Sequence, residues 1–415
     1  MNGSYRARQI AHLLRFLIPH NASVLEVKED EFRSFKLDIL GAPFDYVYLS
    51  GKLEYLHDIE GTLRDISRIL KEDEGRLVII SYNYLWYPVI RIAELLGIRK
   101  KRPVQNWLTI HDVETFLHLA DFEVISSGKR ILCPVYIPIL SFLLNRIIGR
   151  LPFLWRLCLM NYVVARPLPH ARKDRSVTIV VPARNERGNI EAIVQRTPLF
   201  PNGEEIIFVE GHSTDGTWEE IERVMERYKN NRVIRAVRQD GIGKGDAVVR
   251  KGFAMAEGEL LMILDADMTV APEDLTKFYR AFVEGKGEFI NGSRLVYPLE
   301  KEAMRFLNNL GNKFFALAFS WLLGQRFKDT LCGTKVLSKS AYERIAANRH
   351  YFGDFDPFGD FDLLFGAAKL NLKIAELPIR YYARRYGETQ IQRFRHGWML
   401  LTMCIFAARK MKFQE

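Results

Sequence analysis

Two aspartates one residue apart are the first feature of this 415-residue chain that could carry chemistry. Asp265 and Asp267 follow the apolar run Leu260–Leu264, which has the pattern of a buried strand. A strand that ends in a tight turn delivers both carboxylates to one divalent cation, and such hard oxygen ligands suit Mg²⁺ or Mn²⁺. A cation held there neutralises a diphosphate as it leaves. We therefore predict that Asp265 and Asp267 are catalytic metal ligands, with Mg²⁺ or Mn²⁺ as cofactor.

Three segments upstream of this pair have the features of a nucleotide site. Pro182 and Ala183 end one strand pattern, and Glu186 lies in the loop that follows it. Glu210 ends the next strand pattern, where its carboxylate could accept hydrogen bonds from a base or ribose. Lys244 stands among closely spaced glycines, in a loop that can pass close to a phosphate. Open α/β sheets bind ligands at the carboxyl ends of their strands, so these residues are predicted to frame a nucleotide.

The acceptor of a transferred group can be inferred from charge. A phosphate acceptor is already ionised at pH 7 and needs positioning and charge neutralisation, for which guanidinium groups are well shaped. The predicted acceptor-binding arginines are Arg384, Arg385, Arg393 and Arg395.

A hydroxyl acceptor would require a general base instead. The acidic cluster DFDPFGDFD offers two candidates, Asp360 and Asp362. Both acceptor types stay open at this point, and the aspartates are kept as candidate catalytic residues.

Strand and helix patterns alternate along the chain, which predicts parallel α/β sheets. A linker pattern with two prolines and a charge cluster, Ala165–Ser176, separates two such regions. The strand patterns cover residues 44–49, 76–82, 176–181, 205–210, 232–237 and 259–265. Helices are predicted at 59–70 and from a capping box at Thr109 and Asp112 through Ala120.

Lys and Arg total 60 against 50 Asp and Glu, so the net charge is +10. Residues 378–415 hold eight basic and two acidic residues, which is +6 of that excess. A nucleic-acid binder more often spreads its basic residues over a domain face, so no nucleic-acid partner is expected. Apolar stretches at 314–324 and 398–408 are too short to span a bilayer, and the second is followed by basic residues, which predicts contact with a membrane surface. Four cysteines without CxxC spacing predict free thiols, and the expected location is the cytoplasmic face of a membrane.

The motifs of residues 176–390, taken in order, resemble family 2 glycosyltransferases of the GT-A fold, and are most similar to the dolichol- and polyprenol-phosphate sugar synthases. They are PARNERGNI, DAD, GSR, DTLCGTK and ELPIRYYARRYGETQI. The resemblance implies that Arg294 of GSR meets phosphate or sugar. The chain departs from the family at Glu210–Gly211, where two aspartates are common, and at Thr269, where a stronger metal ligand is frequent.

Residues 20–82, and more loosely those up to 166, resemble class I S-adenosylmethionine methyltransferases. The pattern VLEV, FDYVYL and RLVII carries this resemblance. The glycine-rich turn that should follow VLEV is replaced by Lys28, Glu29, Asp30 and Glu31. The resemblance therefore implies a degenerate module that does not bind S-adenosylmethionine.

The predicted architecture is α/β with two domains: a truncated Rossmann-like methyltransferase-type domain at 1–166 and, after a linker at 167–175, a GT-A domain at 176–392. Residues 393–415 are predicted to form a basic, apolar helix at the membrane interface. The predicted function is inverting, metal-dependent transfer of a sugar from a nucleotide-diphosphate sugar to a membrane-associated acceptor, namely polyprenyl phosphate. Two alternatives stay open: transfer to a hydroxyl of a glycan or glycolipid, and a non-catalytic nucleotide-sugar-binding scaffold. The sequence also leaves oligomerisation open.

Overall fold

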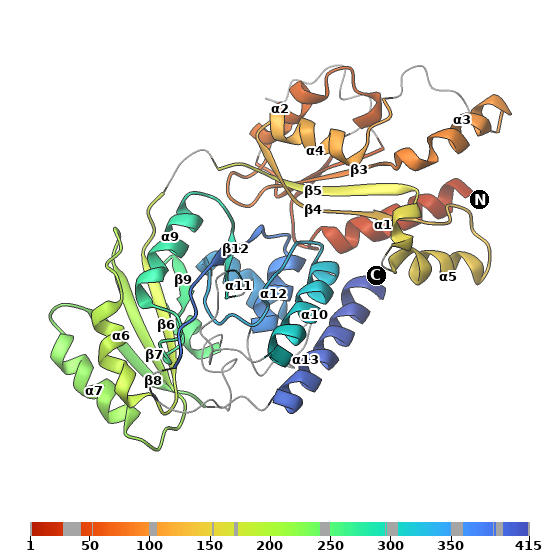
Figure 1. Cartoon of the computed structure of the whole chain (residues 1–415). Coiled ribbons are helices and arrows are strands. Elements are labelled where there is room, and N and C mark those ends of the chain that lie inside the picture. The colour runs from red at the N-terminus through yellow and green to blue at the C-terminus, as the bar shows by residue number, and fades with distance from the viewer. Residues whose placement is uncertain are drawn as a thin grey trace. The chain divides into compact units, whose positions relative to one another are not determined.

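A computed structural model shows how the chain folds (Figure 1). The structure describes residues 2–27, 43–51, 53–98, 106–151, 153–169, 173–240, 250–294, 296, 306–349, 360–384, 386 and 393–413. The chain divides into two compact units, the first comprising Met1–His170 with Arg409–Glu415 and the second comprising Ala171–Ala408.

The first unit contains a five-stranded sheet with the order β1-β2-β3-β5-β4. Its strands are β1 (Val24–Glu26), β2 (Tyr46–Ser50), β3 (Arg76–Tyr82), β4 (Phe122–Arg130) and β5 (Met160–Pro167). The first three are parallel, whereas β5 runs antiparallel to both β3 and β4.

Helices cover both faces of this sheet because successive strand residues point to opposite sides. Leu77 and Ile79 of β3 pack with α2 and α4, while Val78 and Ile80 pack with α1. The helices are α1 (Asn2–Leu17), α2 (Ile59–Ile69), α3 (Tyr87–Leu95), α4 (Ile110–Leu119) and α5 (Leu140–Arg146), with short 3₁₀ helices η3 (Leu53–Tyr55), η4 (Tyr84–Trp86), η5 (Ile148–Arg150) and η6 (Leu154–Leu157).

The second unit contains a seven-stranded mixed sheet with the order β12-β10-β11-β9-β6-β7-β8. Its strands are β6 (Val177–Ala183), β7 (Glu204–Glu210), β8 (Val233–Arg238), β9 (Leu260–Ile263), β10 (Phe289–Ser293), β11 (Lys335–Ser338) and β12 (Ile374–Pro378). Strands β6 to β9 are mutually parallel, and β11 runs antiparallel to its neighbours β9 and β10.

An apolar core lies between this sheet and the helices α6, α7 and α9. The helices of the unit are α6 (Ile190–Arg196), α7 (Thr217–Tyr228), α8 (Phe253–Met255), α9 (Leu275–Val283), α10 (Phe306–Leu323), α11 (Lys339–Ala347), α12 (Asp360–Lys369) and α13 (Arg393–Ala408), with 3₁₀ helices η7 (Arg187–Asn189) and η9 (Pro272–Asp274). Helices α10 and α13 lie side by side (Figure 1).

The predicted elements are confirmed with small shifts at their ends. The strand predicted at 76–82 is β3, and those at 176–181 and 205–210 are β6 and β7. The predicted capping box is present, because the Thr109 hydroxyl accepts from the Asp112 amide and the Asp112 carboxylate accepts from the Thr109 amide. The predicted α/β class is therefore confirmed, but the prediction of parallel sheets is wrong in part, because β5 in the first sheet and β11 in the second run antiparallel to their neighbours.

The C-terminal segment is divided differently from the prediction. Residues 393–415 were predicted as one helix, but α13 groups with the second unit and the π-helical turn Arg409–Phe413 (η11) groups with the first. The Arg146 guanidinium holds that turn by donating to the Phe413 carbonyl at 3.1 Å. Within the described residues, no helix combines the length and apolarity needed to cross a bilayer.

Candidate functional site

The candidate site lies where the strand order of the second sheet reverses. The chain moves from β6 to β7 and β8 on one side, and then returns to β9 on the other side of β6. Parallel sheets bind ligands in the crevice outside the carboxyl ends of the strands at such a reversal. Glu210 ends β7, and the loops that follow β6 and β9 contain Glu186 and Asp267, so the topology brings three predicted site residues to one edge.

The turn after β9 presents the paired aspartates. Met268 adopts a positive φ of 59°, which closes the turn directly after Asp267. One Asp267 oxygen, Oδ1, accepts from both the amide and the hydroxyl of Thr269, at 3.1 and 2.7 Å. Thr269 therefore fixes the Asp267 carboxylate, a role distinct from the weak metal ligand considered for it.

The charges of both aspartates influence one tyrosine. Burial raises the pKa of the Tyr381 hydroxyl, and the negative charges of Asp267 and Asp265 raise it further.

Arg384 joins the β6 loop to the aspartate turn. Its guanidinium donates to Glu186 Oε1 at 2.8 Å and to Asp267 Oδ2 at 2.9 Å. Burial raises the pKa of the Glu186 carboxyl to about 7, although Arg384 and the Asn189 amide oppose this shift. The Arg384 guanidinium therefore lies between two predicted site carboxylates. The guanidinium would attract a phosphate, and the carboxylates would attract a metal ion.

Glu210 is anchored by its own loop. Its Oε1 accepts from the Ser213 amide at 2.5 Å, and Oε2 lies 3.8 Å from the Arg238 guanidinium. The side chain is almost wholly buried. Pro182 and Ala183 lie at the end of β6 in register with Val209 and Glu210.

A segment near the C-terminus crosses this edge. The Tyr386 hydroxyl donates to Asp215 at 3.2 Å, and the Tyr382 amide donates to the Thr269 carbonyl at 2.9 Å. Gly188 permits the close approach, since a Cβ there would lie 2.7 Å from the Tyr386 ring. The residues around Arg384 are thus pinned at both the β7 loop and the aspartate turn.

Arg294 forms a buried ion pair. Its Nε and Nη2 donate to the two carboxylate oxygens of Asp329, at 2.7 and 2.8 Å, and its backbone amide donates as well. Burial alone would raise the pKa of the Asp329 carboxyl, but Arg294 holds it below its usual range. One edge of the Arg294 guanidinium is thus already bonded to Asp329. The predicted contact of Arg294 with phosphate or sugar would have to use the remaining N–H groups.

Glu376 continues this network by accepting from the amides of Lys328 and Asp329, at 2.8 and 3.0 Å. The GSR and DTLCGTK motifs and the start of ELPIRYYARRYGETQI are therefore joined through buried polar contacts.

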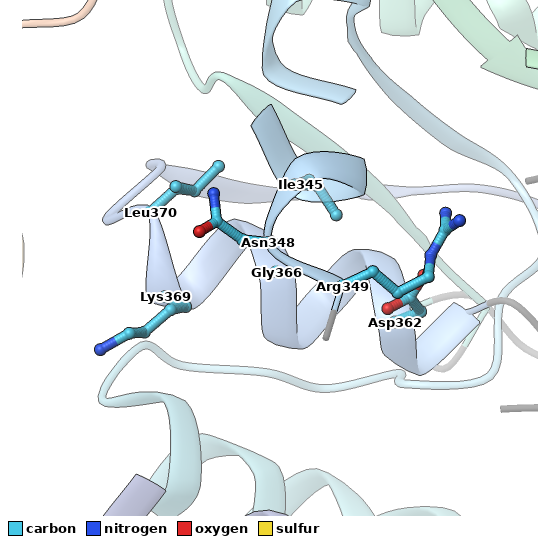
Figure 2. Close-up of a pocket in the computed structure, with 7 residues that line it drawn as sticks. All are labelled: Ile345, Asn348, Arg349, Asp362, Gly366, Lys369 and Leu370. Atoms are coloured by element: carbon cyan, nitrogen blue, oxygen red, sulfur yellow. The ribbon is translucent and has the colours of Figure 1, made fainter. Parts of the chain in front are cut away.

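Asp362 is paired outside this edge. Figure 2 shows its carboxylate beside Arg349 at a pocket between α11 and α12, and Arg349 Nε donates to Asp362 Oδ2 at 2.8 Å. None of the residues that line the pocket belongs to the predicted nucleotide or metal set; they are Ile345, Asn348, Arg349, Asp362, Gly366, Lys369 and Leu370. The Arg349 guanidinium occupies one oxygen of the Asp362 carboxylate, which counts against the general-base role considered for Asp362.

Several predicted residues cannot be placed. Lys244 and Arg385 lie outside the described residues, and the side chains of Asp360, Arg393 and Arg395 are not described. Their roles stay predictions.

The donor set fits a divalent cation. Within the described part of the chain, no three His, Cys, Asp or Glu side chains gather as a closed metal site. Two carboxylates on one turn are instead an open set, which diphosphate oxygens would complete. Asp267 Oδ2 already accepts from a positive group, Arg384. A metal cation that displaced the Arg384 guanidinium could therefore bind this oxygen.

Three contributors had no predicted role in holding the site together, namely Asp215, Asp329 and Tyr386. Each acts by holding another residue or segment in place, and no spacing rule links Tyr386 to Asp215 across 171 positions. Asp329 lies within the motif DTLCGTK, but the motif gave no indication that its carboxylate pairs with Arg294.

The family model described as "Glycosyl transferase family 2" matches residues 178–349. The chain is 28% identical over 228 residues to "Glycosyltransferase AglJ" of Haloferax volcanii, a match that covers 54% of this chain and 69% of that protein. It is 29% identical over 221 residues to a dolichol-phosphate mannosyltransferase of Pyrococcus furiosus, covering 52% of this chain and 59% of that protein, which is less than two thirds of its length.

A third relative is the UDP-N-acetylglucosamine–dolichyl-phosphate N-acetylglucosaminyltransferase of Methanococcus voltae, at 26% identity over 52% of this chain and 88% of that protein. Among solved structures, glucosyl-3-phosphoglycerate synthase from Mycobacterium tuberculosis in complex with UDP matches 57% of this chain and 80% of its own, with 19% identity and a TM-score of 0.41. The same enzyme with Mn²⁺, UDP-glucose and phosphoglyceric acid matches with a TM-score of 0.42.

Proposed function

We propose that this chain, whose residues 178–349 match the family 2 glycosyltransferase model, is a glycosyltransferase that transfers a sugar from a nucleotide-diphosphate sugar to polyprenyl phosphate with inversion and a divalent metal. The family match favours catalysis over the non-catalytic scaffold alternative. The observation that carries the proposal is the meeting of Asp267, Glu186 and Arg384 at the strand-order reversal. The donor has both a sugar and a diphosphate. A site that combines carboxylates with a guanidinium can bind both parts of such a molecule.

The chain's own residues would act mainly by binding and positioning. The loops after β6 and β7, with Glu186 and Glu210, frame the nucleotide, and Asp265 and Asp267 hold the metal. When bound, the metal neutralises the diphosphate as it leaves. Arg384 can then turn from Asp267 to a phosphate oxygen, since its side chain is about a quarter exposed.

The acceptor proposal rests on charge and on the relatives' names. An ionised lipid phosphate needs no general base, and Asp362 is already neutralised by Arg349. Two of the three relatives are named for dolichol-phosphate or dolichyl-phosphate acceptors. Transfer to a hydroxyl of a glycolipid remains the second candidate, because Asp360 has not been placed.

A lipid acceptor implies work at a membrane surface. Helices α10 and α13 bury Phe319 and Met403 but expose Leu317, Trp398 and Ile405. We propose that these exposed side chains enter the interface, and that the protein is peripheral on the cytoplasmic face.

The first unit is not reached by the family match. Its sheet is α/β, as expected, but the methyltransferase-like resemblance of residues 20–82 stays a prediction. Its proposed role is docking, without S-adenosylmethionine.

A panel of UDP-, GDP- and dTDP-sugars should identify the donor by thermal shift. At a concentration roughly 100 times Kd, a ligand specific for the native state adds about 2.7 kcal/mol, which raises the melting temperature of a domain of this size by about 5–10 °C. We expect one nucleotide class to give this shift with Mn²⁺ and a smaller shift without it. The proposal fails if no sugar nucleotide shifts the midpoint under either condition.

Substitutions should separate the two acceptor types. For a phosphate acceptor, Arg393→Ala is expected to lower kcat/KM by about 10–100-fold, because a charge-assisted hydrogen bond is lost. For a hydroxyl acceptor, Asp360→Asn or Asp362→Asn would lower it by about 10²–10⁴-fold, as for a general base. Arg280→Ala, an exposed arginine on α9, is the matched control. A loss with an aspartate variant and none with Arg393→Ala would transfer the proposal to a hydroxyl acceptor.

A further inference from the structure

The first unit exposes an unusual amount of apolar surface in one stretch of chain. Residues 132–157, which contain α5, η5 and η6, expose large side chains throughout: Tyr136, Ile139, Phe142, Leu143, Phe153 and Leu157. Ile139 and Phe153 are each about three-quarters exposed and have positive φ angles of 63° and 72°. Such angles are rare for bulky residues, so the backbone here departs from its ordinary conformations while presenting apolar groups to solvent.

Helix α3 extends the same surface. Val89, Ile92 and Leu96 recur at helical spacing, and all three are exposed. The Trp86 indole donates to the Leu157 carbonyl at 2.8 Å, which places the start of α3 beside η6. Figure 1 shows α3 and α5 at the same end of the unit. Contiguous apolar patches of this kind on a soluble surface mark interaction sites.

Charge indicates what covers this surface. Residues 124–165 contain five basic residues and no acidic one, and of the five Arg130 and Arg150 are buried. Arg156 is exposed, and its guanidinium lies 5.9 Å from the Phe153 ring. The basic turn η11 is held at the same place, because Arg146 and Arg150 donate to the carbonyls of Phe413 and Lys412. The exposed Arg409 is therefore added to the rim of the apolar surface.

We infer that residues 132–157, with α3 and the turn η11, form a docking surface for an anionic phospholipid bilayer. Apolar and aromatic side chains with a basic rim match the acyl boundary and the phosphate layer of such a membrane. A second copy of the chain fits less well. In a two-fold interface the same surface is used by both copies, so the basic rim of one copy would face the basic rim of the other and repel it. The inference concerns the first unit and goes beyond the proposed function, which located membrane contact in the second.

The test is co-sedimentation of the full chain with vesicles of phosphatidylcholine alone or mixed with phosphatidylglycerol. We expect the double variant Phe142→Glu/Phe153→Glu to lower the partition coefficient by about tenfold or more on both vesicle types. Arg156→Gln/Arg409→Gln should lower binding on the anionic vesicles only, in a salt-dependent manner. Leu199→Glu, at a residue that is 74% exposed in the second unit, is the matched control and should bind as the native chain does.

Transfer to a detergent-dispersed polyprenyl phosphate is measured on the same variants. Native transfer rates with lost vesicle binding support the inference. The inference would be overturned if the Phe142→Glu/Phe153→Glu variant bound vesicles as strongly as the native chain. It would also be overturned if the native chain were a dimer, the variant were a monomer, and neither protein bound vesicles. Absence of transfer by the native chain refutes the proposed function alone and leaves the vesicle result to stand.

Discussion

Asp267→Asn is expected to reduce sugar transfer by about 10³-fold or more while leaving the protein folded. A metal on a diphosphate supplies several kcal/mol of charge stabilisation, and each 1.36 kcal/mol changes the rate about tenfold. The substitution keeps the shape of the side chain, and the Thr269 hydroxyl can still donate to its Oδ1. The lost ion pair with Arg384 is partly exposed, so its removal should cost only about 1 kcal/mol of stability.

The measurements are steady-state transfer and the Mn²⁺-dependent thermal shift on the same preparation. Both should be lost together, since one carboxylate serves both. Asp274→Asn is the control, because Asp274 pairs with Lys277 at the surface of the same unit. If Asp267→Asn kept its transfer rate and its Mn²⁺-dependent shift, the metal assignment would be wrong.

The aspartate pair was predictable because its signal is local. An apolar run followed by two carboxylates one residue apart specifies a strand and a turn, and β9 ends at Ile263, directly before that turn. The positive φ of Met268 was not predictable, because methionine carries no preference for it. In the structure this angle accompanies the turn in which Thr269 donates to Asp267.

The role of Arg384 could not be predicted from the sequence. It was expected at an acceptor phosphate, yet it contacts Glu186, 198 positions away, and Asp267. The strand-order reversal at β6 creates this meeting, and the register of seven strands is a property of the whole sheet. Local spacing carries no information on it, which also explains why Tyr386 was missed.

The fold followed the sequence most closely where burial is two-sided. Strands β3 and β6 are buried along nearly their whole length, so continuous apolar runs marked them. The C-terminal segment was harder, because its apolar helix and its basic turn belong to different units. The charge pattern predicted that residues 393–415 form one basic helix. In the structure, the Phe413 and Lys412 carbonyls accept from Arg146 and Arg150, which holds the turn η11 in the first unit.

Asp329→Asn is expected to lower the free energy of unfolding by about 3–5 kcal/mol. The substitution leaves the guanidinium of Arg294 buried without its partner charge, and that penalty exceeds the worth of the ion pair itself. The control is Glu273→Gln, which breaks a two-bonded pair with Arg196 at the surface and should cost about 1 kcal/mol or less. Urea denaturation of the full chain measures both.

The same pair makes a prediction about acid and about rescue. The folded pKa of Asp329 lies below its ordinary value near 3.8, so its stabilisation is complete above that value and is lost as pH falls through the folded pKa. The loss caused by Asp329→Asn should therefore shrink below about pH 4. Arg294→Met combined with Asp329→Leu should recover much of the stability, because apolar groups of similar volume remove the uncompensated charge. If this double variant were as unstable as Asp329→Asn, the cost would have to come from the Asp329 contacts with the Leu331 amide and the Arg294 amide rather than from the buried guanidinium.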